Sequence, residues 1–138
     1  MFSDEKMILD IRLNVLNEYV DHFVIVESKY KHNGDIKEKK FNIEDFSKFK
    51  NKIIYIYSDK EPNNLISINQ SINENEKNEN LIHNTYLREN SQRDMINEGI
   101  SGANVNDLIM VGDIDEIPNL KNFNFEEIKK NIIVFKQK

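Results

Sequence analysis

The stretch FVIVE, residues 23–27, decides the fold class of this 138-residue chain. Four apolar side chains, three of them β-branched, follow one another without a polar break. Such a run is typical of a strand that is buried on both faces of a parallel sheet. Three further runs have a similar composition: IIYIY at 53–57, LIMVGD at 108–113 and IIVF at 132–135. The sequence therefore predicts four buried strands.

Segments with helical spacing of apolar residues lie between these runs. Residues 3–20 fit a helix in which Ser3 caps the first turn and apolar side chains recur every three or four positions. Residues 83–100 fit a second helix that ends at a glycine, and residues 125–130 fit a short third one. The polar stretch 58–80 is expected to form a long loop.

This order of segments predicts an α/β fold with a mainly parallel sheet. The length suits a single domain over residues 1–138. Because the run at 132–135 lies close to the last residue, its strand edges would have no later partners. We therefore expect the domain to be truncated at its C-terminus, and the isolated chain to be poorly soluble or self-associating.

The composition excludes several classes of protein. The 24 acidic and 19 basic residues give a net charge of −5, which argues against a nucleic-acid partner. No apolar stretch approaches the roughly 18 residues of a membrane span, and the N-terminus lacks the basic and apolar parts of a signal peptide. The chain has no cysteine, which excludes disulfides and cysteine-based zinc sites. We expect a cytoplasmic protein.

The most informative motif is the acidic sequence DIDE, residues 113–116, directly after the third expected strand. Asp113 and Asp115 are two positions apart, so in an extended segment both carboxylates would point to one side. Two such hard oxygen ligands can hold Mn²⁺ or Mg²⁺ against substrate phosphates. The alternative is a strand that simply ends in solvated acids. Since ligands of parallel sheets bind at the carboxyl ends of strands, Glu27 and Ser28 are expected near the same site.

Several ordered motifs resemble glycosyltransferase family 17, the family of the bisecting β-1,4-mannosyl-glycoprotein N-acetylglucosaminyltransferase. The resemblance covers residues 2–118. The motifs that carry it are FSDE at 2–5, IRL at 11–13, VDHFVIVES at 20–28, RENSQRD at 88–94 and DIDEIP at 113–118.

The resemblance implies a GT-A, Rossmann-like domain that transfers a sugar, N-acetylglucosamine in this family, from a UDP-sugar to a glycan acceptor. Asp113 and Asp115 would ligate Mn²⁺ or Mg²⁺ on the diphosphate, and Glu116 would support that site. The residues expected beside the nucleotide are Glu27, Ser28, Arg93 and Asp94. The acceptor-binding half of the family is expected to be missing, and no catalytic base is assigned.

Two other interpretations stay open at this point. The first is a non-catalytic remnant that binds a nucleotide. The second is a phosphohydrolase in which the first aspartate of the motif is the nucleophile, although more than a hundred residues precede the motif here. Arg12, on the first expected helix, is as compatible with tying that helix to an acidic loop as with contacting a ligand.

Overall fold

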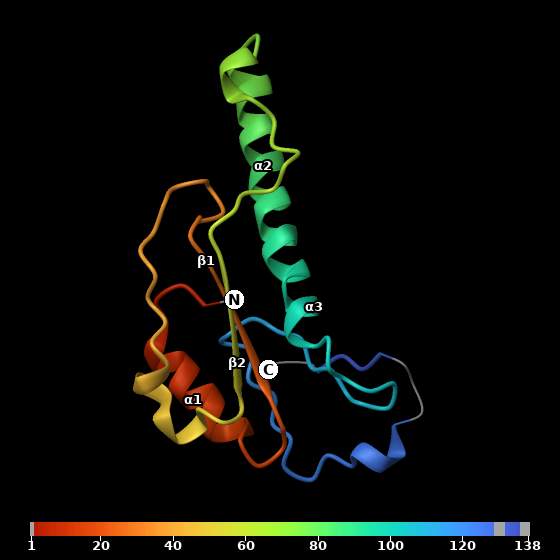
Figure 1. Ribbon diagram of the computed structural model, residues 1–138. Coiled ribbons are helices and arrows are strands. Elements are labelled where there is room, and N and C mark those ends of the chain that lie inside the picture. The colour runs from red at the N-terminus through yellow and green to blue at the C-terminus, as the bar shows by residue number, and fades with distance from the viewer. Residues whose placement is uncertain (1, 129–131, 136–138) are drawn as a thin grey trace.

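The computed structural model describes residues 2–128 and 132–135. They form a mixed α/β fold with a small parallel sheet between helices (Figure 1). The elements in chain order are α1 (Lys6–Leu16), β1 (Phe23–Ser28), the 3₁₀ helix η1 (Ile43–Phe49), β2 (Ile53–Ser58), η2 (Ile68–Gln70), α2 (Glu74–Asp94), α3 (Ile96–Gly99) and η3 (Phe125–Glu127).

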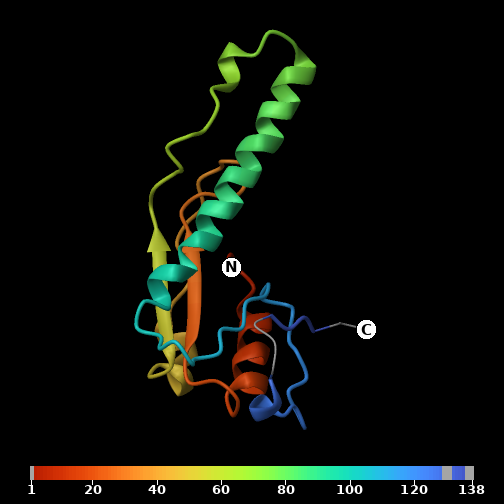
Figure 2. The ribbon, with the colours of Figure 1, turned by 90° about the vertical axis from the view of Figure 1, so that its right-hand side faces the viewer.

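The first two expected strands are confirmed. β1 and β2 run parallel and in register from the pair Phe23–Ile53 to the pair Ser28–Ser58, and Figure 2 shows them side by side. Their β-branched and aromatic side chains favour the extended backbone, and helices cover both faces of the pair.

The faces of the two strands pack against different helices. On one face, α1, β1 and η1 contribute to the main apolar core, which includes Leu9, Leu13, Leu16, Phe23, Ile25, Phe41, Phe46 and Phe49. On the other face, α3 approaches so closely that a Cβ on Gly99 would meet both Cγ atoms of Val24, the farther one at 2.9 Å. Glycine at position 99 therefore allows this helix to contact the sheet.

The third expected strand is wrong. Residues 108–111 lie outside the sheet, in a segment without strand structure. The Phe23 amide donates to the Lys52 carbonyl just before β2, and the Lys29 amide donates to the Ser58 carbonyl at its end. Backbone groups of alternate residues point to opposite edges of a strand, so the Val26 carbonyl faces the edge of β1 away from β2. There the amide of Phe2 donates to the Val26 carbonyl at 2.9 Å. The N-terminal segment thus occupies part of the edge at which residues 108–111 would have paired.

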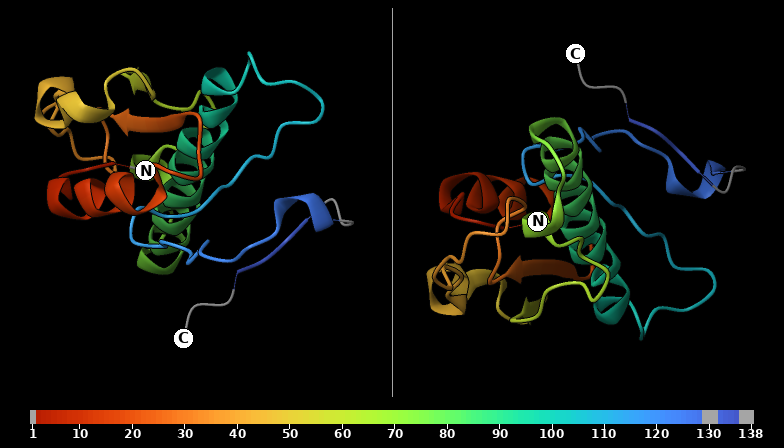
Figure 3. Two further views of the ribbon diagram at one scale, coloured as in Figure 1. Left: turned by 90° about the horizontal axis from the view of Figure 1, so that it is seen from below. Right: turned by 90° about the horizontal axis from the view of Figure 1, so that it is seen from above.

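The fourth expected strand is also wrong, because residues 132–135 have no strand partner within the described part of the chain. Phe135 instead packs against Phe123, with ring centroids 5.4 Å apart. Short apolar runs specify extended backbone but not the neighbour that completes a ladder. Figure 3 shows most of the chain after α3 as open loops beside the helices and strands.

The helix boundaries differ from the sequence-based ones. α1 begins after Glu5, without a side-chain cap from Ser3. α2 begins at Glu74, well before residue 83, because the Asn73 side chain caps it by accepting a hydrogen bond from the Glu76 amide. Part of the expected loop 58–80 is therefore helical. Of the expected helix 125–130, only the 3₁₀ turn of η3 forms within the described residues, and positions 129–130 lie outside them.

No helix among the described residues is both long and apolar enough to cross a membrane. α2, the longest, is strongly polar, and its N-terminal half rises beyond the carboxyl ends of the strands (Figures 1 and 2).

Candidate functional site

The acidic motif forms a tight turn, which we call the acidic turn (residues 113–116). The Glu116 amide donates to the Asp113 carbonyl at 3.0 Å, and the Glu116 carboxylate accepts from the Asp113 amide at 2.9 Å. The expectation of an extended segment here is wrong. One backbone hydrogen bond and one bond to the Glu116 side chain close the turn.

Arg12 of α1 holds both ends of the acidic turn. Its Nη1 donates to the backbone carbonyls of Asp113 and Glu116, each at 2.7 Å. Burial lowers the pKa of the Arg12 guanidinium, and the carboxylates of Glu116, Asp113 and Asp115 oppose this effect. Of the two roles open for Arg12 from the sequence, the structure supports tying the first helix to the acidic loop.

Arg93 near the end of α2 reaches the same turn from the other side. Its Nη2 lies 3.0 Å from Glu89 Oε1 and 3.3 Å from Asp113 Oδ1. The hydrogen bond to Glu89 raises the pKa of Arg93, and the Asp113 and Glu116 carboxylates add to the shift. Two residues predicted for the site, 20 positions apart, are therefore brought together.

Arg93 and Asp113 both line a pocket of about 560 Å³ beyond the carboxyl end of β1, which we call the strand-end pocket. Phe2, Tyr30 and Lys31 contribute to its wall. The volume lies within the range typical of small-molecule sites, and its position matches the edge at which parallel sheets bind ligands.

Glu27, predicted to lie beside a nucleotide, is a completely buried carboxylate with 0% exposure. It accepts hydrogen bonds from the Lys40 amide at 2.7 Å, the Phe41 amide at 3.1 Å and the Tyr55 hydroxyl at 2.7 Å. The Lys37 ammonium lies 3.6 Å away. These contacts give the buried charge the partners that it needs.

Ser28 is also buried, and its hydroxyl accepts a hydrogen bond from the Tyr30 amide at 3.0 Å. This bond fixes the course of the chain just after β1, where Tyr30 and Lys31 enter the strand-end pocket. Asp94 and Asp115 are exposed and are not among the residues that line this pocket.

The oxygen ligands of the acidic turn suit a hard cation by their chemistry. The Asp113 side chain is about half exposed and Asp115 is exposed. Across residues 2–128 and 132–135, no group of three acidic or histidine side chains is arranged to hold a metal ion. A cation on these two carboxylates would therefore take its remaining ligands from water and from a bound phosphate.

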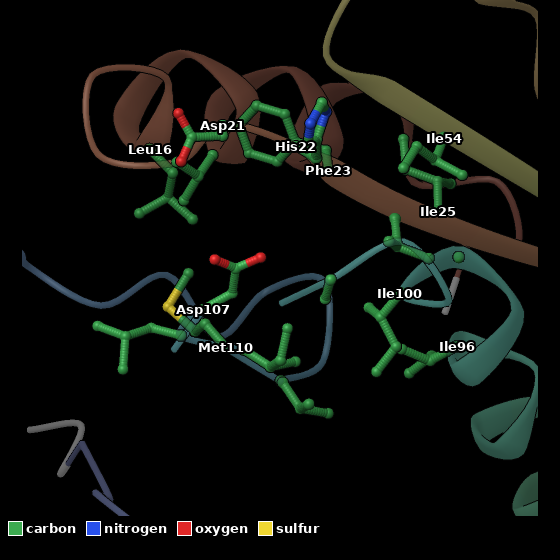
Figure 4. A pocket seen from close by; sticks show the side chains of 18 of the residues that line it. Leu16, Asp21, His22, Phe23, Ile25, Ile54, Ile96, Ile100, Asp107 and Met110 are labelled. Carbon is green, nitrogen blue, oxygen red and sulfur yellow. The ribbon is translucent and has the colours of Figure 1, made fainter. Parts of the chain in front are cut away.

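A larger, mostly apolar cavity of about 880 Å³ separates β1 from the segment that follows α3. Figure 4 shows Phe23 and Ile25 on one side of this sheet-edge cavity, with Met110 and Asp107 across from them. It occupies the space that a third strand would have filled.

Sequence reasoning missed Lys37 as a structural residue, since its lysine-rich stretch suggested a solvated loop. Its side chain is only 11% exposed, beside Glu27, and its ammonium donates to the Phe2 carbonyl at 3.3 Å. No local signal distinguishes it from the neighbouring Lys39 and Lys40, because its partners are distant in sequence.

These features define an α/β protein in which an arginine and an acidic turn meet at the carboxyl end of a parallel strand. The family model of glycosyltransferase family 17 matches residues 1–132, nearly the entire chain. The chain belongs to glycosyltransferase family 17, which confirms the resemblance in its sequence motifs. No curated protein and no solved structure matches it. Family membership implies glycosyltransferase activity with a nucleotide-sugar donor.

Proposed function

We propose that this chain is a metal-dependent glycosyltransferase domain of the GT-A type, a single domain over residues 1–138. It would transfer a sugar, N-acetylglucosamine, from a UDP-sugar to a glycan acceptor. The observation that carries the proposal is the meeting of Arg93 and Asp113 at the strand-end pocket, in a chain of glycosyltransferase family 17.

The strand-end pocket offers both basic and acidic groups to a ligand. Its lining includes three basic side chains, Lys31, Lys37 and Arg93, and three acidic ones, Glu5, Glu89 and Asp113. Guanidinium groups bind phosphate oxygens with paired hydrogen bonds, which favours Arg93 as a contact to the nucleotide. Asp94 follows it at the end of α2 and is exposed.

Asp113 and Asp115 would hold Mn²⁺ or Mg²⁺ in this proposal, with Glu116 supporting the site through its bond to the Asp113 amide. A bound divalent cation would stabilise the negative charge that develops on the diphosphate leaving group. The Asp113 carboxylate already contacts one cationic group, the Arg93 guanidinium.

Glu27 and Ser28 serve the donor site indirectly in this proposal, because both side chains are buried. Ser28 would position Tyr30, and Glu27 would position Lys37, and both Tyr30 and Lys37 line the pocket. A nucleotide would lie against the chain that follows β1.

Calorimetry with UDP tests the proposal, with and without Mn²⁺. We expect Mn²⁺ to strengthen UDP binding, and Asp113→Ala to abolish that gain. Asp45→Ala is the matched control, because Asp45 is an aspartate on η1 that pairs with Lys6 at 2.6 Å and does not line the pocket. Equal UDP binding with and without Mn²⁺ would contradict the proposed metal site.

A second assay separates a transferase from a protein that only binds nucleotides. Transfer of N-acetylglucosamine from UDP-N-acetylglucosamine to a mannose-containing acceptor supports the full proposal. Metal-dependent UDP binding without hydrolysis or transfer would instead favour a nucleotide-binding role.

A further inference from the structure

We propose that Arg12 is a positioning residue of the donor site, which fixes the acidic turn relative to the core. This inference rests on the proposed function, because it assigns a role in metal-dependent nucleotide binding to a residue outside the strand-end pocket.

The contacts of Arg12 close the acidic turn from outside. One nitrogen, Nη1, donates to the carbonyls of Asp113 and Glu116 at 2.7 Å each, and it lies 3.5 Å from the Ile114 carbonyl. These carbonyls belong to the first, second and last residues of the turn. A single guanidinium therefore holds both ends of the turn at a fixed separation.

α1 anchors this guanidinium to the core. Leu9 and Leu13, which flank Arg12 on the helix, are 3% and 0% exposed. Interior packing allows little displacement of such side chains. The turn is therefore tied to α1 by an arginine that lies 101 residues away from Asp113 along the sequence.

The arrangement also determines where the carboxylates of the turn are held. With the backbone carbonyls facing Arg12, the Glu116 carboxylate bonds to the Asp113 amide and the Asp113 carboxylate contacts Arg93. Gly112 leaves the space that this needs, since a Cβ there would lie 3.0 Å from Glu116 Oε2. Residues that orient metal ligands without touching the metal themselves are needed for full metal affinity.

The test compares Arg12→Ala and Arg12→Lys with the unaltered full chain. Arg12→Lys keeps the positive charge, but its side chain is one bond shorter, so its ammonium stops short of the carbonyls that Nη1 reaches. Lys52→Ala is the matched control, because Lys52 Nζ also donates to two backbone carbonyls, those of Asn17 at 2.7 Å and Val20 at 2.8 Å, and does not line the strand-end pocket.

Two measurements are made on each protein. Hydrogen exchange at the Glu116 amide reports the order of the turn without any ligand, and calorimetry reports UDP affinity with and without Mn²⁺. We expect both Arg12 variants to lose protection at Glu116 and to lose about 10-fold to 100-fold of Mn²⁺-dependent UDP affinity. UDP affinity without metal should be unchanged, and so should both measurements on the Lys52→Ala protein.

Retained protection at Glu116 in folded Arg12→Lys would overturn the inference. Lost protection with an unchanged Mn²⁺ effect on UDP binding would overturn it too, because Arg12 would then order the turn without serving the donor site. If Mn²⁺ has no effect on the unaltered protein, the proposed function fails, and the exchange data still report whether Arg12 orders the turn.

Discussion

Arg93 Nη2 lies 3.3 Å from Asp113 Oδ1, and this contact joins the end of α2 to the acidic turn at the strand-end pocket. Glu89, one helical turn before Arg93, holds the same nitrogen at 3.0 Å. Both members of the Arg93–Asp113 pair are substantially exposed. Exposed ion pairs contribute little to folding, so the stability of the protein depends little on this contact.

Replacing Arg93 by glutamine should weaken nucleotide binding more than folding. We expect Arg93→Gln to lower UDP affinity about tenfold, because a charge-assisted contact to the diphosphate is lost. The free energy of unfolding should change by less than about 1 kcal/mol. Calorimetry and urea titration measure the two effects.

Lys77→Gln is the control for Arg93→Gln, since it removes another exposed ion pair of α2, with Glu74 at 3.4 Å. Equal UDP affinities of the two variants would show that Arg93 does not contact the nucleotide.

Replacing Glu27 by glutamine should destabilise the protein strongly. The new NH₂ group would replace one carboxylate oxygen in a site with 0% exposure. It would face either the Lys40 amide or the Phe41 amide and the Tyr55 hydroxyl. We expect a loss of roughly 3 kcal/mol in the free energy of unfolding, the scale for breaking a buried charged network. Urea titration at neutral pH measures the loss.

Glu38→Gln provides the comparison, because the Glu38 side chain is 88% exposed and pairs with Lys40 at 3.6 Å only. If both variants unfold at the same urea concentration, the buried contacts of Glu27 do not contribute net stability.

Tyr55 should make stability fall at alkaline pH. Burial, together with the hydrogen bond to Glu27, raises the pKa of the Tyr55 hydroxyl above its ordinary value. In the unfolded chain the tyrosine loses its proton at about pH 10, while in the folded protein Tyr55 keeps it. The contribution of Tyr55 to the free energy of unfolding is therefore complete below about pH 10 and is lost as the pH rises further.

Urea titrations at about pH 8 and about pH 11 measure this loss, on either side of the ordinary tyrosine pKa. Tyr55→Phe should lose less stability between the two pH values than the unaltered protein. Tyr86→Phe, at an exposed position, should lose as much as the unaltered protein. Parallel losses in all three proteins would exclude the role of Tyr55.

Adding one methyl group to Gly99 should separate α3 from the sheet. A Cβ there would overlap Val24 and approach Ile56 Cδ1 at 3.1 Å. We expect Gly99→Ala to lower the free energy of unfolding by about 1–3 kcal/mol, the scale for overpacking. Gly102→Ala is the control, since a Cβ at Gly102 would meet nothing within 4 Å. A melting temperature unchanged by Gly99→Ala would contradict this contact.

The sequence by itself determined two strands of this protein and its family. The runs at 23–27 and 53–57 predicted β1 and β2 and their parallel pairing, and the ordered motifs predicted the family that the whole-chain match confirms. Backbone preference, apolar burial and motif order are properties of contiguous residues, so they can be read without a structure.

Only the tertiary structure decided which distant groups meet. The run at 108–111 resembles the two real strands, yet Phe2 takes part of the available edge and a cavity separates the rest from β1. Likewise, the contact of Arg93 with Asp113 depends on where α2 ends in space. Strand pairing and side-chain partners are set by competition among segments far apart in the chain, and composition alone does not encode the outcome of that competition.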